Sequence, residues 1–166
     1  MSTHDATRRH RSNDQSGGRI HYRHLVVMIG LSFLTMYVLM YAMVDVFDNV
    51  YSNLNQAYMA GLMAAPMAII ELVVMRMMYR ERRLNLVIGG VSVVVLAVCW
   101  ALIRQQTAIG DRQFLRSMIP HHAGAILMCG EASVSDAEIK ALCKNIVTSQ
   151  QSEIDQMRVI LGRLDR

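Results

Sequence analysis

The stretch 86–103, LVIGGVSVVVLAVCWALI, decides the fold class of this chain. It contains no charged residue, and its length approaches the roughly 20 residues that a helix needs to cross about 30 Å of hydrocarbon. Two other stretches have the same character: 25–44, which also lacks charge, and 58–75, whose one charged residue is Glu71. We therefore expect an all-α protein with three transmembrane helices within residues 25–104.

The composition agrees with a membrane protein, because 53% of the residues are hydrophobic and only 18% are charged. A soluble domain usually has about 25% charged residues. The first apolar stretch is about twice as long as the usual core of a signal peptide, roughly 7–15 residues, and no small-x-small cleavage pattern follows it. We expect it to be a retained anchor.

The arginines indicate an orientation. Five of them lie in the polar tail 1–24, which we expect to be disordered, and four lie in the loop 76–84. The loop between the first two spans has no Lys or Arg. Because positive charge favours the cytoplasmic side, the pattern predicts a cytoplasmic N-terminus and an exported C-terminal domain. In a bacterium this means the inner membrane, with the domain in the periplasm or outside the cell.

The same basic segments could in principle contact nucleic acid. The tail, however, has no aromatic residue besides Tyr22, and membrane orientation already accounts for the charge. We expect the arginines to contact anionic lipid headgroups instead, and we expect no nucleic-acid partner.

Residues 111–162 predict a second domain, an antiparallel hairpin of two helices. Asp111 is a good N-cap for the first helix, which should end near Ala132. Ser135 and Glu138 have the spacing of a capping box at the start of the second helix, and Gly162 is a plausible stop. A hairpin of this size cannot bury an adequate core by itself. It should form a four-helix bundle by dimerisation, or dock onto the membrane region.

The first hairpin helix places thioethers and imidazoles on one face. At about 100° per residue, four side chains share this face: Met118, His121, His122 and Met128. The second helix has its own cluster of Gln150, Glu153 and Met157. Thioether and imidazole ligands together favour Cu(I), with silver as a possible surrogate, while Gln150 and Glu153 could orient the imidazoles. The competing interpretation is a methionine-rich core with structural histidines.

A second methionine stripe lies in the membrane. Met59, Met63, Met67 and Glu71 follow one another at steps of four residues along the second span. A carboxylate within a membrane usually faces the interior of a helix bundle and marks a functional pathway. The stripe is therefore a candidate Cu(I) path with Glu71 at its inner end. A simple packing seam is the alternative.

Three cysteines complete the candidate chemistry. Cys99 lies within the third span and is expected to serve packing. Cys129 and Cys143 lie in the hairpin, where the expected register offsets them by about three residues in height. We therefore expect no intrachain disulfide between them.

The pattern Asp111-x-x-Phe-Leu-x-x-Met-Ile-Pro-His-His-x-x-Ala-Ile-x-Met128, followed by Gln150-x-x-Glu-Ile-x-x-Met157, resembles the bacterial family catalogued as domain of unknown function 305. The resemblance covers residues 111–161. It implies a ferritin-like helical bundle, and some members are periplasmic copper-binding proteins linked to copper resistance. Carried over to this chain, it implies metal ligands at five positions: Met118, His121, His122, Met128 and Met157. Larger members have two such hairpins and many members are secreted, so a single hairpin favours a homodimer and the three spans argue against a simple soluble carrier.

These observations lead to two functional hypotheses. The first is a membrane-anchored protein that sequesters or handles copper or silver outside the cytoplasm. The second is a non-catalytic module that oligomerises in the membrane and whose His121–His122 pair is structural. We expect no enzymatic activity, because the sequence shows no nucleophile–base pair, phosphate loop or cofactor fingerprint.

Overall fold

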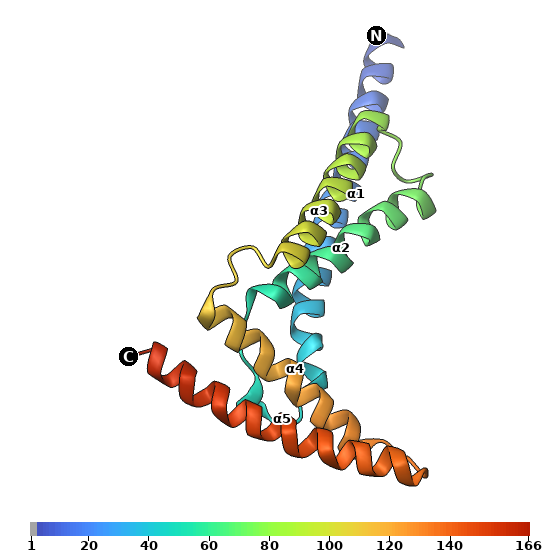
Figure 1. Cartoon of the computed structure of the whole chain (residues 1–166). Coiled ribbons are helices and arrows are strands. Elements are labelled where there is room, and N and C mark those ends of the chain that lie inside the picture. The colour runs from blue at the N-terminus through green and yellow to red at the C-terminus, as the bar shows by residue number, and fades with distance from the viewer. Residues whose placement is uncertain (1–2) are drawn as a thin grey trace. The chain divides into compact units, whose positions relative to one another are not determined.

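The computed structural model describes residues 3–166 and is all-helical over that range (Figure 1). The confirmed all-α fold has seven helical elements there: α1 Thr3–Leu39, η1 Met40–Met43, η2 Phe47–Asn49, α2 Leu54–Val74, α3 Arg82–Gln105, α4 Asp111–Glu131 and α5 Ala137–Leu164. These elements form two compact units. The membrane unit comprises residues up to 36 together with 59–102, and the hairpin unit comprises 37–58 together with 103–166.

Three helices are long and apolar enough to cross a membrane, over Ile20–Met43, Leu54–Val74 and Arg82–Gln105. They confirm three helices of membrane length at the predicted positions, to within a few residues. The first of them continues a longer helix, because α1 begins at Thr3 and so includes the tail that we expected to be disordered. The physical reason is that adding residues to a helix that has already nucleated costs little.

Small residues form the buried side of α2 in the membrane unit. Ala60, Ala64 and Ala68 are buried at steps of one turn. Gly61 faces the Cys99 sulfur of α3 so closely that an added Cβ would lie 2.8 Å from it. Small side chains allow helices to approach closely, which is the main source of helix association in lipid.

A polar cluster joins α1 to the connection between α2 and α3. The Tyr22 hydroxyl donates to Asn85 Oδ1 at 2.7 Å and accepts from the Glu81 backbone N–H at 3.2 Å. The Tyr22 and Tyr79 rings lie 5.1 Å apart, and the Tyr79 hydroxyl donates to Glu71 Oε1 at 3.3 Å. Glu71 therefore has a hydrogen-bond partner at the end of α2.

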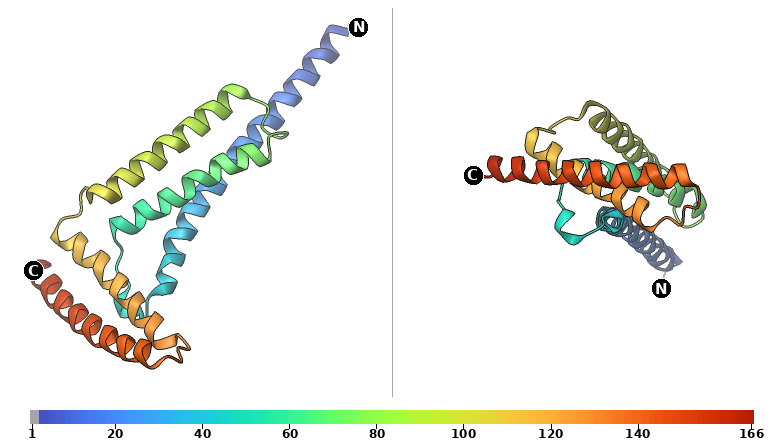
Figure 2. Two further views of the ribbon diagram at one scale, coloured as in Figure 1. Left: turned by 45° about the vertical axis from the view of Figure 1, so that its right-hand side comes forward. Right: turned by 60° about the horizontal axis from the view of Figure 1, so that its bottom comes forward.

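The hairpin unit contains α4 and α5, which pack side by side and antiparallel (Figure 2). α4 ends at Glu131, as predicted, but its N-cap is Gly110 rather than Asp111. α5 is capped by Asp136, whose carboxylate accepts from the backbone N–H groups of residues 138 and 139. The predicted Ser135 cap is therefore wrong, because a carboxylate one residue further on is a stronger acceptor than a hydroxyl.

The end of α5 also differs from the prediction. The helix continues to Leu164, past the proposed stop at Gly162. Both Leu161 and Leu164 pack in the hairpin core, so burial of apolar side chains holds the last turn in place. Glycine in a helix costs only about 1 kcal/mol relative to alanine, which this burial offsets.

The hairpin completes its core with its own chain. Its buried residues are contributed by both helices: Leu115, Ile119, Ala123, Ile154, Met157 and Leu161. Val44 and Tyr51, from the connection between α1 and α2, pack against them. The same connection is held by polar contacts, since the Arg158 guanidinium donates to buried Asn49 Oδ1 at 2.8 Å. Within its own unit, the hairpin therefore packs against residues of the 40–53 connection.

Candidate functional site

The buried side of α4 differs from the predicted one. Leu115, Ile119 and Ala123 are buried there, and their stripe is centred about 100° around the helix from Met118. His122 lies on the edge of this stripe and is buried. His121, the residue just before His122, lies on the opposite side of α4 and is exposed.

Met128 also lies outside the buried stripe, with 55% of its surface exposed. The expectation that both imidazoles and both thioethers of α4 share the core-facing side is therefore wrong for His121 and Met128. The reason is that α4 has apolar residues on two sides, and α5 packs against the side that contains Ile119. Met118 lies between the two sides and is half-buried against the core.

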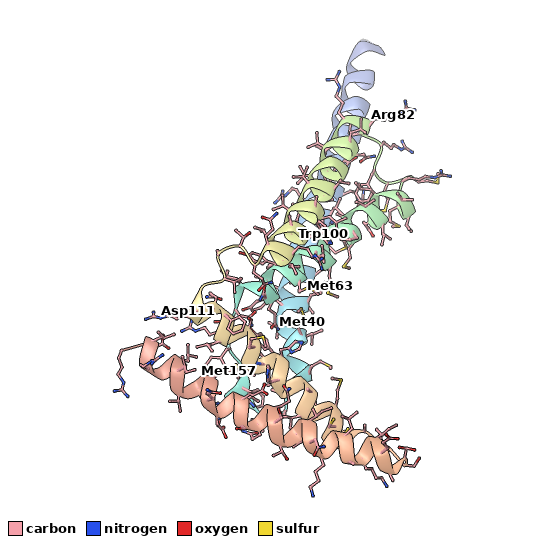
Figure 3. The ribbon with its side chains drawn as sticks, in the orientation of Figure 1. Met40, Met63, Arg82, Trp100, Asp111 and Met157 are labelled. Atoms are coloured by element: carbon pink, nitrogen blue, oxygen red, sulfur yellow. The ribbon has the colours of Figure 1, made fainter. Side chains whose placement is uncertain are left out.

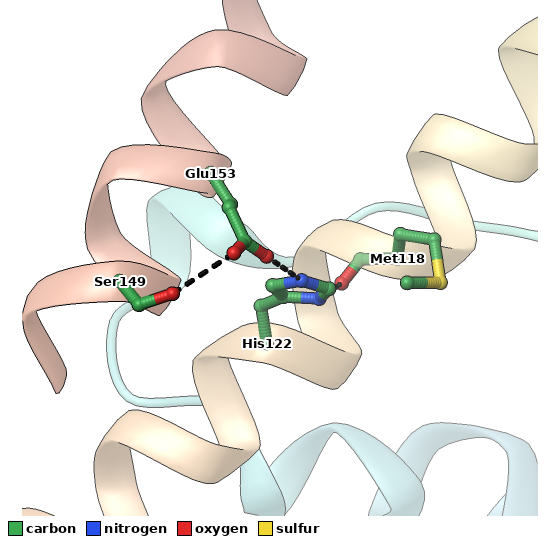
Figure 4. A network of polar contacts seen from close by, with 4 residues as sticks. All are labelled: Met118, His122, Ser149 and Glu153. Carbon is green, nitrogen blue, oxygen red and sulfur yellow. Dashed lines mark hydrogen bonds and ion pairs between the residues drawn. The ribbon is translucent and has the colours of Figure 1, made fainter. Parts of the chain in front are cut away.

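His122 is held through both ring nitrogens. Its Nδ1 lies 2.9 Å from the carbonyl oxygen of Met118, and its Nε2 lies 2.7 Å from Glu153 Oε2 on α5. The hydroxyl of Ser149, one turn before Glu153, donates to Glu153 Oε1 at 2.9 Å. Figure 4 shows this chain of contacts from α4 to α5. The predicted pairing of the histidines with Glu153 is thus present for His122.

The hydrogen bonds indicate the charge of Glu153. The bond from Ser149 and then the contact with His122 lower the pKa of Glu153, so the carboxyl is ionised at neutral pH. The Met118 carbonyl can only accept a hydrogen bond, so His122 Nδ1 donates to it and Nε2 faces the Glu153 carboxylate. The His122 side chain is only 10% exposed and the Glu153 side chain is 48% exposed, so their contact is open to water on one side.

One turn of α4 presents three possible metal ligands. Met118, His121 and His122 have the spacing i, i+3 and i+4, and the two imidazole ring centres lie 6.2 Å apart. The Met118 carbonyl fixes His122 Nδ1 and leaves Nε2 as the nitrogen that could bind a metal, the usual arrangement for a histidine ligand. The Met118 thioether points away from Glu153 (Figure 4). Across the residues whose side chains the structure describes, 20–166, no three His, Cys, Asp or Glu side chains converge on a metal position.

The remaining predicted hairpin ligands lie apart from this turn. Met157 is buried in the hairpin core (Figure 3), and Gln150 is half-buried on α5. Met128 follows Met118 by ten residues, which is about 15 Å along a helix. Met128 therefore cannot share one ion with Met118 within a single hairpin.

The methionines of α2 do not line the interior of the membrane unit. Met59 and Met63 lie on its exposed side (Met63 is labelled in Figure 3), while Met67 and Glu71 are half-buried. The alanine stripe of α2 is buried in their place. Within the described part of a single chain, the predicted Cu(I) path is thus not enclosed.

The structure brings together two cysteines that we expected to be offset. Cys129 and Cys143 line the same cavity, and the neighbouring Cys143 thiol, together with a smaller effect of burial, raises the pKa of Cys129. They form no disulfide. The linker 132–136 has extended backbone at Ala132 and Asp136, where α4 ends and α5 begins. The contact of Ser149 with Glu153 was not predicted from the sequence, although their i, i+4 spacing favours a side-chain contact on a helix.

Comparisons with known proteins agree with this architecture. The family model described as "Domain of unknown function (DUF305)" matches residues 99–161. "Uncharacterized protein L153" from Acanthamoeba polyphaga mimivirus is 31% identical over 140 residues, covering 82% of this chain and 90% of that protein. Because 140 residues exceed the length of the hairpin, this similarity extends into the membrane-length helices. No solved structure matches the chain.

Proposed function

This chain belongs to the DUF305 family, and we propose that it is a membrane-anchored protein whose hairpin binds a soft metal ion, copper(I) above all. The observation that supports this most is the turn of α4 with Met118, His121 and His122, in which His122 Nδ1 is already fixed by a carbonyl. The ion is cargo that the protein sequesters or hands on, with silver(I) as a chemical surrogate.

The three proposed ligands have the chemistry that copper(I) prefers. One thioether and two imidazoles are soft to borderline ligands and suit copper(I) better than hard cations. To bind, His122 Nε2 must give up its contact with Glu153. The released carboxylate then lies beside the positive ion and partly compensates its charge. Metal affinity should therefore decrease on acidification.

The packing of the hairpin unit supports the proposed topology. The connection 40–53 contacts α4 and α5, so the first loop and the C-terminal domain belong on the same side of a bilayer. The arginine distribution independently predicts that the first loop and the C-terminal domain lie on the same side. Together with the cytoplasmic preference of Arg-rich segments, this packing supports a hairpin outside the cytoplasm.

The test is a copper(I) titration of the full chain in detergent, against a chromophoric competitor under reducing conditions. All three cysteines are replaced by serine, so that thiolates contribute nothing. We expect the double variant His121→Ala/His122→Ala to bind at least about a hundredfold more weakly, because linked ligands act at high effective concentration. The matched control is His21→Ala/His24→Ala, which removes two histidines outside the hairpin. Equal affinities of the two double variants would refute the proposal.

The alternative function, an interaction module, is favoured by exposed apolar side chains on the hairpin. Four of these have about half or more of their surface exposed: Phe114, Met128, Leu142 and Val159. Large exposed apolar surface commonly marks a protein interface. Light scattering of the detergent-solubilised chain separates the hypotheses. A dimer that forms equally with and without metal favours the module, and a dimer that needs copper(I) favours metal binding.

A further inference from the structure

The end of the hairpin contains a second group of possible ligands, two turns away from His122. Cys129 is near the end of α4 and Cys143 is in the second turn of α5. Both thiols are free, both are only partly buried, and both line the same cavity. The two thiols therefore lie near each other without a covalent bond and remain within reach of a solute.

A cavity of about 280 Å³ adjoins this pair. Its lining comes from the last turn of α4, the linker and the first turns of α5: Cys129, Val134, Lys140, Cys143, Lys144, Val147 and Thr148. The only side chains there with a full positive charge are the two lysines, and the lining includes no carboxylate. The surroundings thus favour a bound group that carries negative charge overall.

We propose that Cys129 and Cys143 form a two-coordinate binding site for a soft monovalent cation such as copper(I) or silver(I). Thiolates are the softest ligands available in proteins and select copper(I) over hard ions. On binding, each S–H bond breaks, two sulfur–metal bonds form and two protons go to solvent. No electron is transferred. The product carries one net negative charge, and Lys140 and Lys144 compensate it.

The surroundings favour this site over two other uses of a thiol pair. A structural zinc site needs four ligands, and the cavity lining offers only two thiols and one hydroxyl besides the lysines. A disulfide would be neutral, and the two lysines would then serve no purpose. A disulfide would also require the sulfur atoms to close to about 2.05 Å.

The thiol site is separate from the ligands on the middle turn of α4. Cys129 follows His122 by seven residues, which is about 10 Å along the helix. The two sites can therefore bind independently. This inference does not need the imidazole site to bind metal, and replacing His121 and His122 leaves both thiols in place.

The experiment titrates the reduced full chain in detergent with copper(I), without air and without any other added ligand. The readouts are the bound metal per chain and the near-ultraviolet charge-transfer absorption of a copper(I)–thiolate bond. We expect the double variant Cys129→Ser/Cys143→Ser to lose this band. Each single serine variant should bind at least about a hundredfold more weakly, because the second ligand is then missing. The matched control, Cys99→Ser, should keep both band and affinity.

The variant His121→Ala/His122→Ala separates this site from the proposed function. It should keep the thiolate band even if the imidazole site binds nothing. Three outcomes would overturn the inference. They are the absence of a thiolate band in the wild type, a band that survives in Cys129→Ser/Cys143→Ser, and thiols that still react fully with an alkylating reagent when copper(I) is present. Circular dichroism shows whether each variant keeps its helical content.

Discussion

α2 and α4 make an informative comparison, because both have 21 residues and one internal proline, Pro66 in one and Pro120 in the other. In each helix, residues predicted to face inward lie outward. These are Met59 and Met63 in α2, and His121 and Met128 in α4. In each helix the buried side belongs to a different stripe, of alanines in α2 and of Leu115, Ile119 and Ala123 in α4.

The difference between the helices lies in what surrounds the exposed stripe. In the proposed topology α2 faces lipid, which is as apolar as methionine, so exposure of Met59 and Met63 costs little. α4 faces water, where exposed apolar surface costs about 25 cal/mol per Å². The exposed side of α4 is therefore the one on which a ligand or a partner would stabilise the protein. Methionine content alone does not distinguish these two situations.

The largest expected effect tests the buried stripe of α4. Ile119 has no exposed surface, so Ile119→Ala should leave a cavity and lower the free energy of unfolding by about 2–5 kcal/mol. Ile70→Ala in α2 is the matched change at a position that is 59% exposed, and it should change stability by less than about 0.5 kcal/mol. Denaturation in detergent followed by circular dichroism measures both. Equal losses would show that the exposed side of α2 is packed.

The second effect separates the two adjacent histidines. His122→Ala removes contacts to Glu153 and to the Met118 carbonyl, and should cost about 1.5–3 kcal/mol, as is typical of hydrogen bonds to charged groups. His121→Ala removes an exposed side chain and should stay within about 0.5 kcal/mol. The same denaturation assay applies. If His121→Ala were the more damaging change, the assignment of the buried side of α4 would be wrong.

The smallest effect is a pH dependence at the edge of the buried stripe. The hydrogen bond from Ser149 and the contact with His122 lower the pKa of Glu153 below its ordinary value of 4.5. A carboxyl with a lowered pKa stabilises the fold above its ordinary pKa, and this contribution is lost as the pH falls through the lowered value. The melting temperature of the wild type should thus decrease more between about pH 7 and about pH 3 than that of Glu153→Gln. If the melting temperatures of both proteins decreased equally, Glu153 would not be the source of the pH dependence.

Local patterns in the sequence predicted the elements well. The apolar stretches predicted three membrane-length helices, and the hairpin helix expected to end near Ala132 ends at Glu131. Glu153 was expected to face a histidine and does so. The choice between His121 and His122 could not be read from the sequence, because α4 has apolar residues on both sides and periodicity alone does not say which side a partner helix covers.

By itself, the sequence determined the helices and their suitability for a membrane. Both properties depend on neighbouring residues, because an apolar helix satisfies its backbone hydrogen bonds within one segment and its length sets whether it spans hydrocarbon. Only the tertiary structure decided which distant side chains meet. Cys129 and Cys143 line one cavity, and Arg158 contacts Asn49, because the path of the linkers and the rotation of each helix place them together. Those quantities depend on packing across the whole unit, which no local pattern encodes.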